Sequence, residues 1–436
     1  MKYTEREVLQ FVQENDVKFV KLMFCDVFGN LKAISVPSEE LPSVFRYGYF
    51  FDASRMEGFM GVCDTDLVLH PVLDTLSLLP WRPQHGRVMR MFCSISRANT
   101  GEPFEGDGRH FLADAVSRAK KLGLEFRVGT SCEFYVFALD AKGLPTKIPH
   151  DTAGKCDVAP ADRGENLRRD ICMTLEQMEL SPSASRHESG PGQNEIDFNA
   201  SSPLSAADNL ITFKNTVKSV SGRDGLYASF MPKPLPDKSG SSLQITISCT
   251  LNGDDVFRLS DGELSPNAAK MTGGLLSSLP AMTLFLNGVT NSYARLNSVG
   301  DMHSLAWSDC NMNTALRLSH TPDGTGTLTL RTPDNTCNPY FAIGLILNAC
   351  IDGLEKGADL PDPVRPDSTY LLSGTASLPL TLEDAVKTAA ESELLHSVLS
   401  EGLLAYVLDK KKNMCAEFEA AQDKEIYEDV KFFYSL

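Results

Sequence analysis

The sequence lacks any apolar run long enough to cross a membrane, and it starts with a charged, helix-like segment rather than an apolar signal core. It also lacks a C-x-x-C pair, and its 11 cysteines are scattered and odd in number. In a chain of 436 residues this pattern argues against a disulfide framework or a zinc ribbon. We therefore expect a cytoplasmic protein with reduced thiols and no membrane partner.

Positive charge is in short supply as well. The 41 lysines and arginines face 57 acidic residues, which gives a net charge of −16. Such a chain repels the phosphates of nucleic acids and of anionic lipids, so neither class of partner is expected. Fixed-period repeats and long low-complexity segments are absent from the sequence too. The length exceeds what one simple core accommodates, which predicts at least two domains or one elaborate one.

Strand-like segments dominate the first hundred residues. Residues 17–37 indicate two strands around a turn at Gly29-Asn30, and further short strands broken by proline follow. The stretch 99–108 is polar and rich in glycine, which is typical of a linker. The front of the chain is therefore expected to form a small β-rich unit.

Beyond the linker, strands and helices alternate without a regular order. The patterns predict helices over 109–123, 166–180 and 206–225, and strands over 124–139, 193–200, 241–251 and 326–333. The first of these strand segments is either a strand pair or one long bent strand. The tail from residue 381 is mostly helical. These patterns favour an α+β class, with a small β domain in front of a larger one.

Three acidic residues lie beside strand-like segments. Glu133 stands in the apolar run "GTSCEFYVF" and shares a strand face with Ser131, because side chains alternate along a strand. Glu188 and Glu195 flank the turn in "RHESGPGQNEIDF". A buried carboxylate is costly unless a cation or donors meet it, and oxygen-only ligands suit Mg²⁺ or Mn²⁺. The alternative is that Glu188 and Glu195 are solvated strand-end acids, while Glu133 caps a helix or pairs with an arginine.

Five segments in a fixed order change the balance between these alternatives. They read "TSCEFYVF", "RHESGPGQNEIDF", "ASFMPKPLPDKSGSSLQ", "NGVTNSYARL" and "TLRTPDNTCNPYFAIGLILNACIDGL". Together with "FFDASRMEGF" near the front, they resemble the successive signature blocks of the glutamine synthetase family. The resemblance runs from about residue 15 to the end of the sequence.

The resemblance implies an N-terminal β-grasp domain over 1–104. A catalytic α+β domain, with a curved antiparallel sheet and surrounding helices, would follow over 105–436. It also implies homo-oligomers built as stacked rings, a dodecamer being the expected size, with sites between neighbouring subunits. Family members activate the γ-carboxyl of glutamate with ATP and let ammonia or an amine displace the phosphate, beside two or three divalent ions.

The family's tighter metal site uses three acids, and Glu133, Glu188 and Glu195 stand in all three places. Asp52 in "FFDAS" matches the acid that binds ammonium across the subunit boundary, where we expect a catalytic role. The other interpretation of Asp52 is a turn cap, since Ser54 lies two residues on.

On the substrate side, Gly240, Arg295 and Arg331 match positions that hold glutamate, and both arginines are also candidates for catalysis. Arg317 matches an arginine near the nucleotide phosphates. Two alternatives stay open: Arg331 could tie a loop through a salt bridge, and Arg317 could be part of a structural ion pair.

The second metal site departs from the family, which places a glutamate, a histidine and another glutamate there. This chain has Ser131, Gln244 and Thr329 instead, and these neutral side chains hold Mg²⁺ poorly against water. Met312 stands where an arginine contacts the transferring phosphoryl group, and Asp301 is the candidate for the flap glutamate.

Three functions are consistent with this sequence. The first is binding of one Mg²⁺ or Mn²⁺ and a glutamate or γ-glutamyl compound without efficient ATP-dependent ligation, with γ-glutamyl amide hydrolysis as its chemistry and no firm ATP site. The second is an ATP-dependent glutamate–ammonia or glutamate–amine ligase. The third is a non-catalytic, ring-forming scaffold or sensor.

Overall fold

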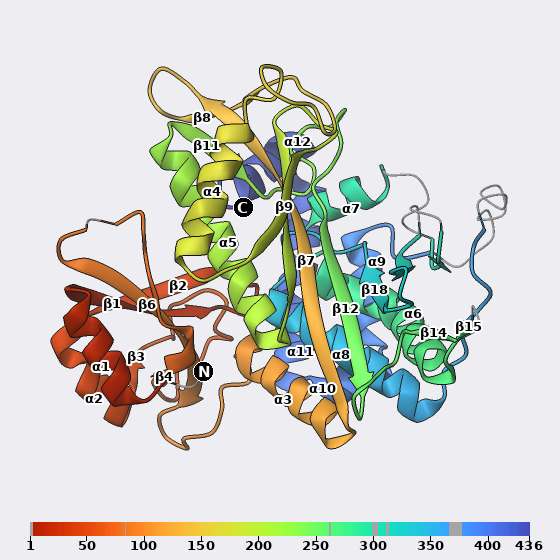
Figure 1. The fold of residues 1–436 in the computed structure, drawn as a ribbon, viewed down its shortest axis with the longest axis horizontal. Helices are drawn as coiled ribbons and strands as arrows, with labels where there is room; N and C mark the ends of the chain where they lie inside the picture. The colour runs from red at the N-terminus through yellow and green to blue at the C-terminus, as the bar shows by residue number, and fades with distance from the viewer. Residues whose placement is uncertain (1–2, 83, 261–262, 299–303, 311–313, 366–376) are drawn as a thin grey trace.

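The computed structural model describes residues 3–82, 84–260, 263–298, 304–310, 314–365 and 377–436. A β-rich N-terminal part lies beside a larger part, in which long strands run among helices (Figure 1). The helices are α1 (Glu5–Glu14), α2 (Leu41–Tyr47), α3 (Gly108–Lys121), α4 (Glu165–Gln177), α5 (Pro203–Arg223), α6 (Pro266–Leu286), α7 (Thr290–Leu296), α8 (Pro339–Lys356), α9 (Leu382–Ala390), α10 (Glu393–Val398), α11 (Glu401–Ala420) and α12 (Lys424–Glu428).

The strands follow in chain order. They are β1 (Val17–Cys25), β2 (Leu31–Pro37), β3 (Tyr49–Phe51), β4 (Leu67–Pro71), β5 (Ser77–Leu78), β6 (Arg87–Arg97), β7 (Leu124–Leu139), β8 (Pro145–Pro149), β9 (Pro182–His187), β10 (Gln193–Ser201), β11 (Leu226–Ser229), β12 (Leu243–Leu251), β13 (Asp254–Asp255), β14 (Leu259–Ser260), β15 (Glu263–Leu264), β16 (Trp307–Ser308), β17 (Leu316–His320) and β18 (Gly326–Leu330).

The N-terminal sheet has the strand order β2-β1-β6-β4-β3, with β5 paired to β6. Its first two strands form the expected hairpin, and Gly29 in the turn has a φ of +83°. An added Cβ at Gly29 would lie 2.8 Å from the Cα of Asn338, at the start of α8. The Asn338 side chain also donates to the carbonyls of Asp26 and Val27, at 3.1 and 3.2 Å. The hairpin is therefore attached directly to the larger part.

The large sheet has the order β16-β17-β18-β12-β7-β10-β9, and β8, β11 and β13 pair outside this path. The pairs along it are antiparallel except β16 with β17. The stretch that was either a strand pair or one bent strand is a single strand, β7, which runs beside β12 through the middle of the molecule (Figure 1). The α+β fold predicted from the sequence is thereby confirmed.

One face of this sheet is apolar and buried, and the other is polar. On β12, Leu243, Ile245 and Ile247 are buried, whereas the alternating Gln244 and Thr246 are half-buried. Strand β18 follows the same pattern. Helices α3 and α5 pack on β7, and α8 packs on both of these helices, which buries the apolar face. The polar face is consequently the one available for ligands.

None of the helices in the described ranges has the length and apolar character that a membrane span requires.

Candidate metal and substrate site

The polar face of the large sheet brings the predicted acids together through strand register. Glu195 on β10 lies opposite Glu133 on β7 and opposite Arg186 on β9. Two residues further along β7, Ser131 lies opposite Asp197 on one side. These strands therefore place Glu133 and Glu195 in one row across the sheet, and Asp197 two residues along β10 on the same face.

We call Glu133, Glu188 and Glu195 the acidic cluster. One carboxylate oxygen of each lies within 4.8 Å of the others. Glu188 and Glu195 are 4% and 2% exposed, so two of the three carboxylates are nearly shielded from water. The backbone nitrogen of Glu188 donates to the carbonyl of Gln193 at 2.8 Å, which closes the turn between these two acids.

Without a cation, burial and mutual repulsion make the ionised form of the acidic cluster unfavourable. Burial, together with nearby Glu188, raises the pKa of Glu133 to about 7. Burial, and then the neighbouring Glu133 and Asp197, raise the pKa of Glu195 to about 8. The Oε1 atom of Glu195 is buried and has no hydrogen-bond partner. This set of oxygen donors fits a hard divalent ion, which would relieve the repulsion and meet the unpaired oxygen.

Two cations of the chain already contact the acidic cluster. The guanidinium of Arg186 lies 2.6 Å from Glu195 and 3.4 Å from Glu188, and it also pairs with Asp197 at 2.7 Å. The Lys155 ammonium lies 3.0 Å from Glu188. Reasoning from the sequence missed Arg186 and Asp197, although both lie within the segment that carries Glu188 and Glu195.

A buried hydrogen-bond network supports the turn from behind. The His187 ring nitrogens lie 2.9 Å from Asp151 Oδ1 and 2.7 Å from the carbonyl of Glu188. Asp151 also accepts from the backbone nitrogen of Gly192 at 2.8 Å. Asp162 lies close to this histidine and pairs with Arg168. Both ring nitrogens of His187 have a partner, so we interpret this network as a support that positions Glu188.

The positions that the resemblance assigns to a second metal carry only neutral groups. Ser131 lies opposite Gln244 in register, and Thr246 lies opposite Thr329. The hydroxyls of Thr246 and Thr329 are 2.9 Å apart and share a hydrogen bond. Hydroxyl and amide oxygens alone do not fit a second divalent ion.

Arg295 on α7 is almost completely buried, at 1% exposure. Its guanidinium donates to the carbonyls of Thr332 and Pro333. Gly240 lies directly on its aliphatic stem, and an added Cβ there would overlap Arg295 Cγ. Gly240 and Arg295, two of the predicted substrate residues, are therefore in contact. The Arg295 guanidinium, however, is bonded to backbone carbonyls.

Arg331 lies just after β18, and part of its guanidinium has no hydrogen-bond partner. Its Nε and Nη1 atoms are buried and make no hydrogen bond. Burial, and then nearby Arg317, lower the pKa of Arg331, while Glu133 and Glu195 act in the opposite direction. A buried guanidinium with unmet donors, under the influence of another arginine and of the acidic cluster, suits an anionic group of a ligand.

Asp52 follows β3 in the N-terminal sheet and is not a member of the acidic cluster. Its carboxylate accepts from the backbone nitrogen of Ser54 at 2.8 Å and is exposed. Hydrogen bonds from Ser54 lower the pKa of Asp52. Within one chain it therefore caps a turn, and a role across a subunit boundary stays a prediction. Met312 and Asp301 lie outside the described residues.

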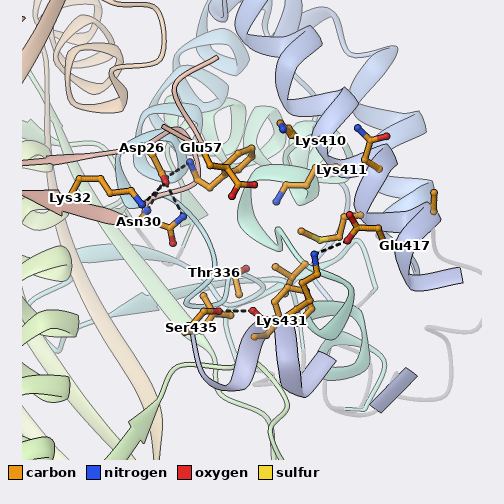
Figure 2. A pocket seen from close by; sticks show the side chains of 17 residues that line it. Asp26, Asn30, Lys32, Glu57, Thr336, Lys410, Lys411, Glu417, Lys431 and Ser435 are labelled. Carbon is orange, nitrogen blue, oxygen red and sulfur yellow. Dashed lines mark hydrogen bonds and ion pairs between the residues drawn. The ribbon is translucent and has the colours of Figure 1, made fainter. Parts of the chain in front are cut away.

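A cavity of about 660 Å³ lies elsewhere in the molecule (Figure 2). It is lined by the turn between β1 and β2, by α11 and by residues near 431–436, with Asp26, Lys32 and Lys411 among them. No member of the acidic cluster lines this cavity, so the cavity is separate from the candidate metal site.

Comparisons with known proteins match nearly the whole chain. Residues 105–429 match the family model "Glutamine synthetase, catalytic domain", and residues 16–98 match "Glutamine synthetase, beta-Grasp domain". A glutamine synthetase of Clostridium saccharobutylicum is 38% identical over 410 residues, 92% of each chain. One from Methanosarcina mazei is 37% identical over 426 residues, 96% of this chain and 95% of the relative. The solved structure "Apo GmaS without ligand" has a TM-score of 0.86 at 28% identity, covering 97% of this chain and 98% of that one.

Proposed function

Because the chain belongs to the glutamine synthetase family, we propose that it binds one divalent cation and a glutamate or γ-glutamyl compound at the acidic cluster. The proposed chemistry is hydrolysis of a γ-glutamyl amide, without efficient ATP-dependent ligation. Hydrolysis adds water across the amide bond, gives the γ-carboxylic acid and the free amine, and needs no phosphate donor.

One observation carries this proposal: the acidic cluster is complete, while the neighbouring positions of the second metal are neutral. Glu133, Glu188 and Glu195 would hold a single Mg²⁺ or Mn²⁺. When bound, such an ion polarises a carbonyl or lowers the pKa of a water molecule. The buried donors of Arg331 would grip a substrate carboxylate, and Asp52 of a neighbouring copy would bind or deprotonate the amine side.

The neutral positions argue against efficient ligation. Phosphoryl transfer depends on positioned charge, and losing one such donor typically costs on the order of 3 kcal/mol, or about a hundredfold in rate. Ser131, Gln244 and Thr329 supply hydroxyl and amide groups, which orient a ligand by hydrogen bonds but do not neutralise a triphosphate.

Calorimetry on the full chain tests the proposal. We expect one Mn²⁺ per chain, binding of glutamate in its presence, and weak or absent binding of ATP. The Glu188→Gln variant keeps the shape of the side chain and should lose the metal. Ammonia release from glutamine, measured with and without ATP, then tests the hydrolysis. An ATP requirement for turnover would contradict this part of the proposal.

The second candidate is an ATP-dependent ligase that joins glutamate to ammonia or an amine. It is favoured by relatives named glutamine synthetase that cover more than nine-tenths of the chain. Phosphate release that needs ATP, glutamate and an amine together would support it over hydrolysis. If no metal bound and Glu188→Ala changed only stability, the scaffold alternative would be favoured over both.

Three further properties belong to this proposal. The boundary between the domains is placed at residues 104 and 105, which is supported by the separate family matches to 16–98 and 105–429. Stacked rings, with a dodecamer as the expected size, would give Asp52 a neighbour to act on, and mass photometry measures that size. A cytoplasmic location is supported by the free cysteines among the described residues.

A further inference from the structure

We propose that Arg186 is a built-in cation of the acidic cluster, which holds the acids together without a metal and lowers their affinity for the divalent ion. This inference rests on the proposed function, because it concerns the same metal site.

The contacts of Arg186 are those of a competitor for ligand atoms. Strand β9 places Arg186 opposite Glu195. Glu188 follows two residues later in the chain, just after β9 ends. Its Nη2 lies 2.6 Å from Glu195 Oε2, and its Nε lies 3.4 Å from Glu188 Oε1. The same carboxylates are those that would bind the ion. A metal must therefore approach acids that already have a partner, with Glu195 Oε1 as the unpaired oxygen.

The charges around the acidic cluster point to a single ion. Asp197 adds a fourth carboxylate beside the three glutamates, and Arg186 and Lys155 are the cations that pair with them. If these ion-paired groups are all ionised, they carry a net charge of about −2, and Arg295 and Arg331 act on the same carboxylates from further away, so there is no charge for a second divalent ion to balance. Arg186 contributes more than Lys155, because the lysine side chain is 60% exposed and screened by water, against 31% for the arginine.

Asp197 gives Arg186 an alternative partner. The guanidinium contacts both oxygens of Asp197, Nη1 at 2.7 Å and Nη2 at 3.3 Å, in a paired arrangement. An arriving ion can therefore take Glu195 and Glu188 while Arg186 stays bound to Asp197. The arginine is accordingly a positioning residue, and the affinity for metal depends on how strongly it holds the two glutamates.

Titration calorimetry with Mn²⁺ on the metal-free full chain tests this role. We expect Arg186→Met to bind Mn²⁺ at least tenfold more tightly than the unaltered protein. Arg186→Lys, which keeps the charge, should stay closer to the original affinity. Arg169→Met is the matched control, because Arg169 is exposed and pairs with its neighbour Asp170. Its Mn²⁺ affinity should not change.

Thermal unfolding supplies the second measurement. Without metal, Arg186→Met should lower Tm, because Glu188 and Glu195 lose their partner, and Mn²⁺ should then raise Tm more than in the unaltered protein. Equal or weaker Mn²⁺ binding by Arg186→Met would overturn this inference alone. If neither protein bound Mn²⁺, the metal site of the proposed function would fail with it.

Discussion

The hydroxyls of Thr246 and Thr329 share a hydrogen bond of 2.9 Å between β12 and β18. Thr329 stands where the family resemblance places a glutamate that binds a metal. In this chain the position carries a neutral group that pairs within the sheet. This part of the site therefore has the chemistry of an ordinary polar sheet face and not that of a cation-binding site.

Restoring the missing ligands should therefore create a second metal site. For the triple variant Ser131→Glu, Gln244→His, Thr329→Glu, we expect the Mn²⁺ stoichiometry in calorimetry to rise from one to two per chain. The physical reason is that two carboxylates and an imidazole replace neutral oxygens. Thr246→Val is the control, since it breaks the threonine pair without adding a ligand. Two ions per chain in the unaltered protein would contradict the prediction.

Replacing Arg331 should weaken substrate binding without weakening the fold. We expect Arg331→Met to lower glutamate affinity by about 10- to 100-fold, which is the effect of losing a charge-assisted hydrogen bond of about 1.5–3 kcal/mol. Because its Nε and Nη1 atoms are buried and unpaired, their removal should leave the free energy of unfolding equal or higher. Calorimetry and urea unfolding measure the two effects. A large loss of stability with unchanged glutamate affinity would favour the loop-tying role.

Enlarging Gly240 should destabilise the protein through Arg295. The Cβ of Gly240→Ala would overlap the Arg295 stem and lie 2.7 Å from the carbonyl oxygen of Pro232. We expect a loss of about 1–3 kcal/mol, as for other overpacked sites. Gly222→Ala on α5 is the matched control: no atom lies within 4 Å of its added Cβ, so it should be neutral or stabilising. Urea unfolding of both variants would show equal stability if the packing argument were wrong.

Lys411 on α11 should make stability depend on pH. Burial lowers the pKa of Lys411 from its ordinary 10.5 to about 8, and its ammonium donates to the carbonyl of Gly288. Between pH 8 and 10.5 the unfolded chain therefore binds more protons than the folded one, so the free energy of unfolding rises with pH.

The measurement compares Lys411→Met with the unaltered protein. The contribution of Lys411 should amount to at most about 3 kcal/mol across that window, and the variant should lack it. Urea unfolding at pH 7.5, 8.5 and 9.5 follows the difference between the two proteins. A difference that stays constant with pH would show that Lys411 does not titrate there.

Much of this architecture could be predicted from the sequence. The alternation of polar and apolar residues in β7, β10 and β12 gives Glu133 and Glu195 their faces on the strands, whereas the grouping of Glu188 with them was predicted from the family resemblance. The hairpin at Gly29 follows from its turn residues. These features are local patterns, or they repeat along a strand, so single-chain reasoning reaches them.

The contacts of Arg186 could not be predicted in this way. Strand β9 has the sequence PSASRH and is largely exposed, so it lacks the apolar alternation that identifies a strand. Without that strand, nothing places Arg186 opposite Glu195. The inward direction of the Arg295 guanidinium was equally hidden, because it depends on carbonyls of Thr332 and Pro333 that come close only in the folded chain.

The close contact between Gly29 and Asn338 has a mechanical consequence. Two hydrogen bonds of the Asn338 side chain join the hairpin to the start of α8, and a Cβ added at Gly29 would lie only 2.8 Å from the Asn338 backbone. Any larger residue at Gly29 would therefore push the hairpin away from α8 and disturb the contact between the N-terminal part and the larger part. In an assembly whose subunits contact one another through the N-terminal part, the start of α8 would help to set the orientation of that contact surface.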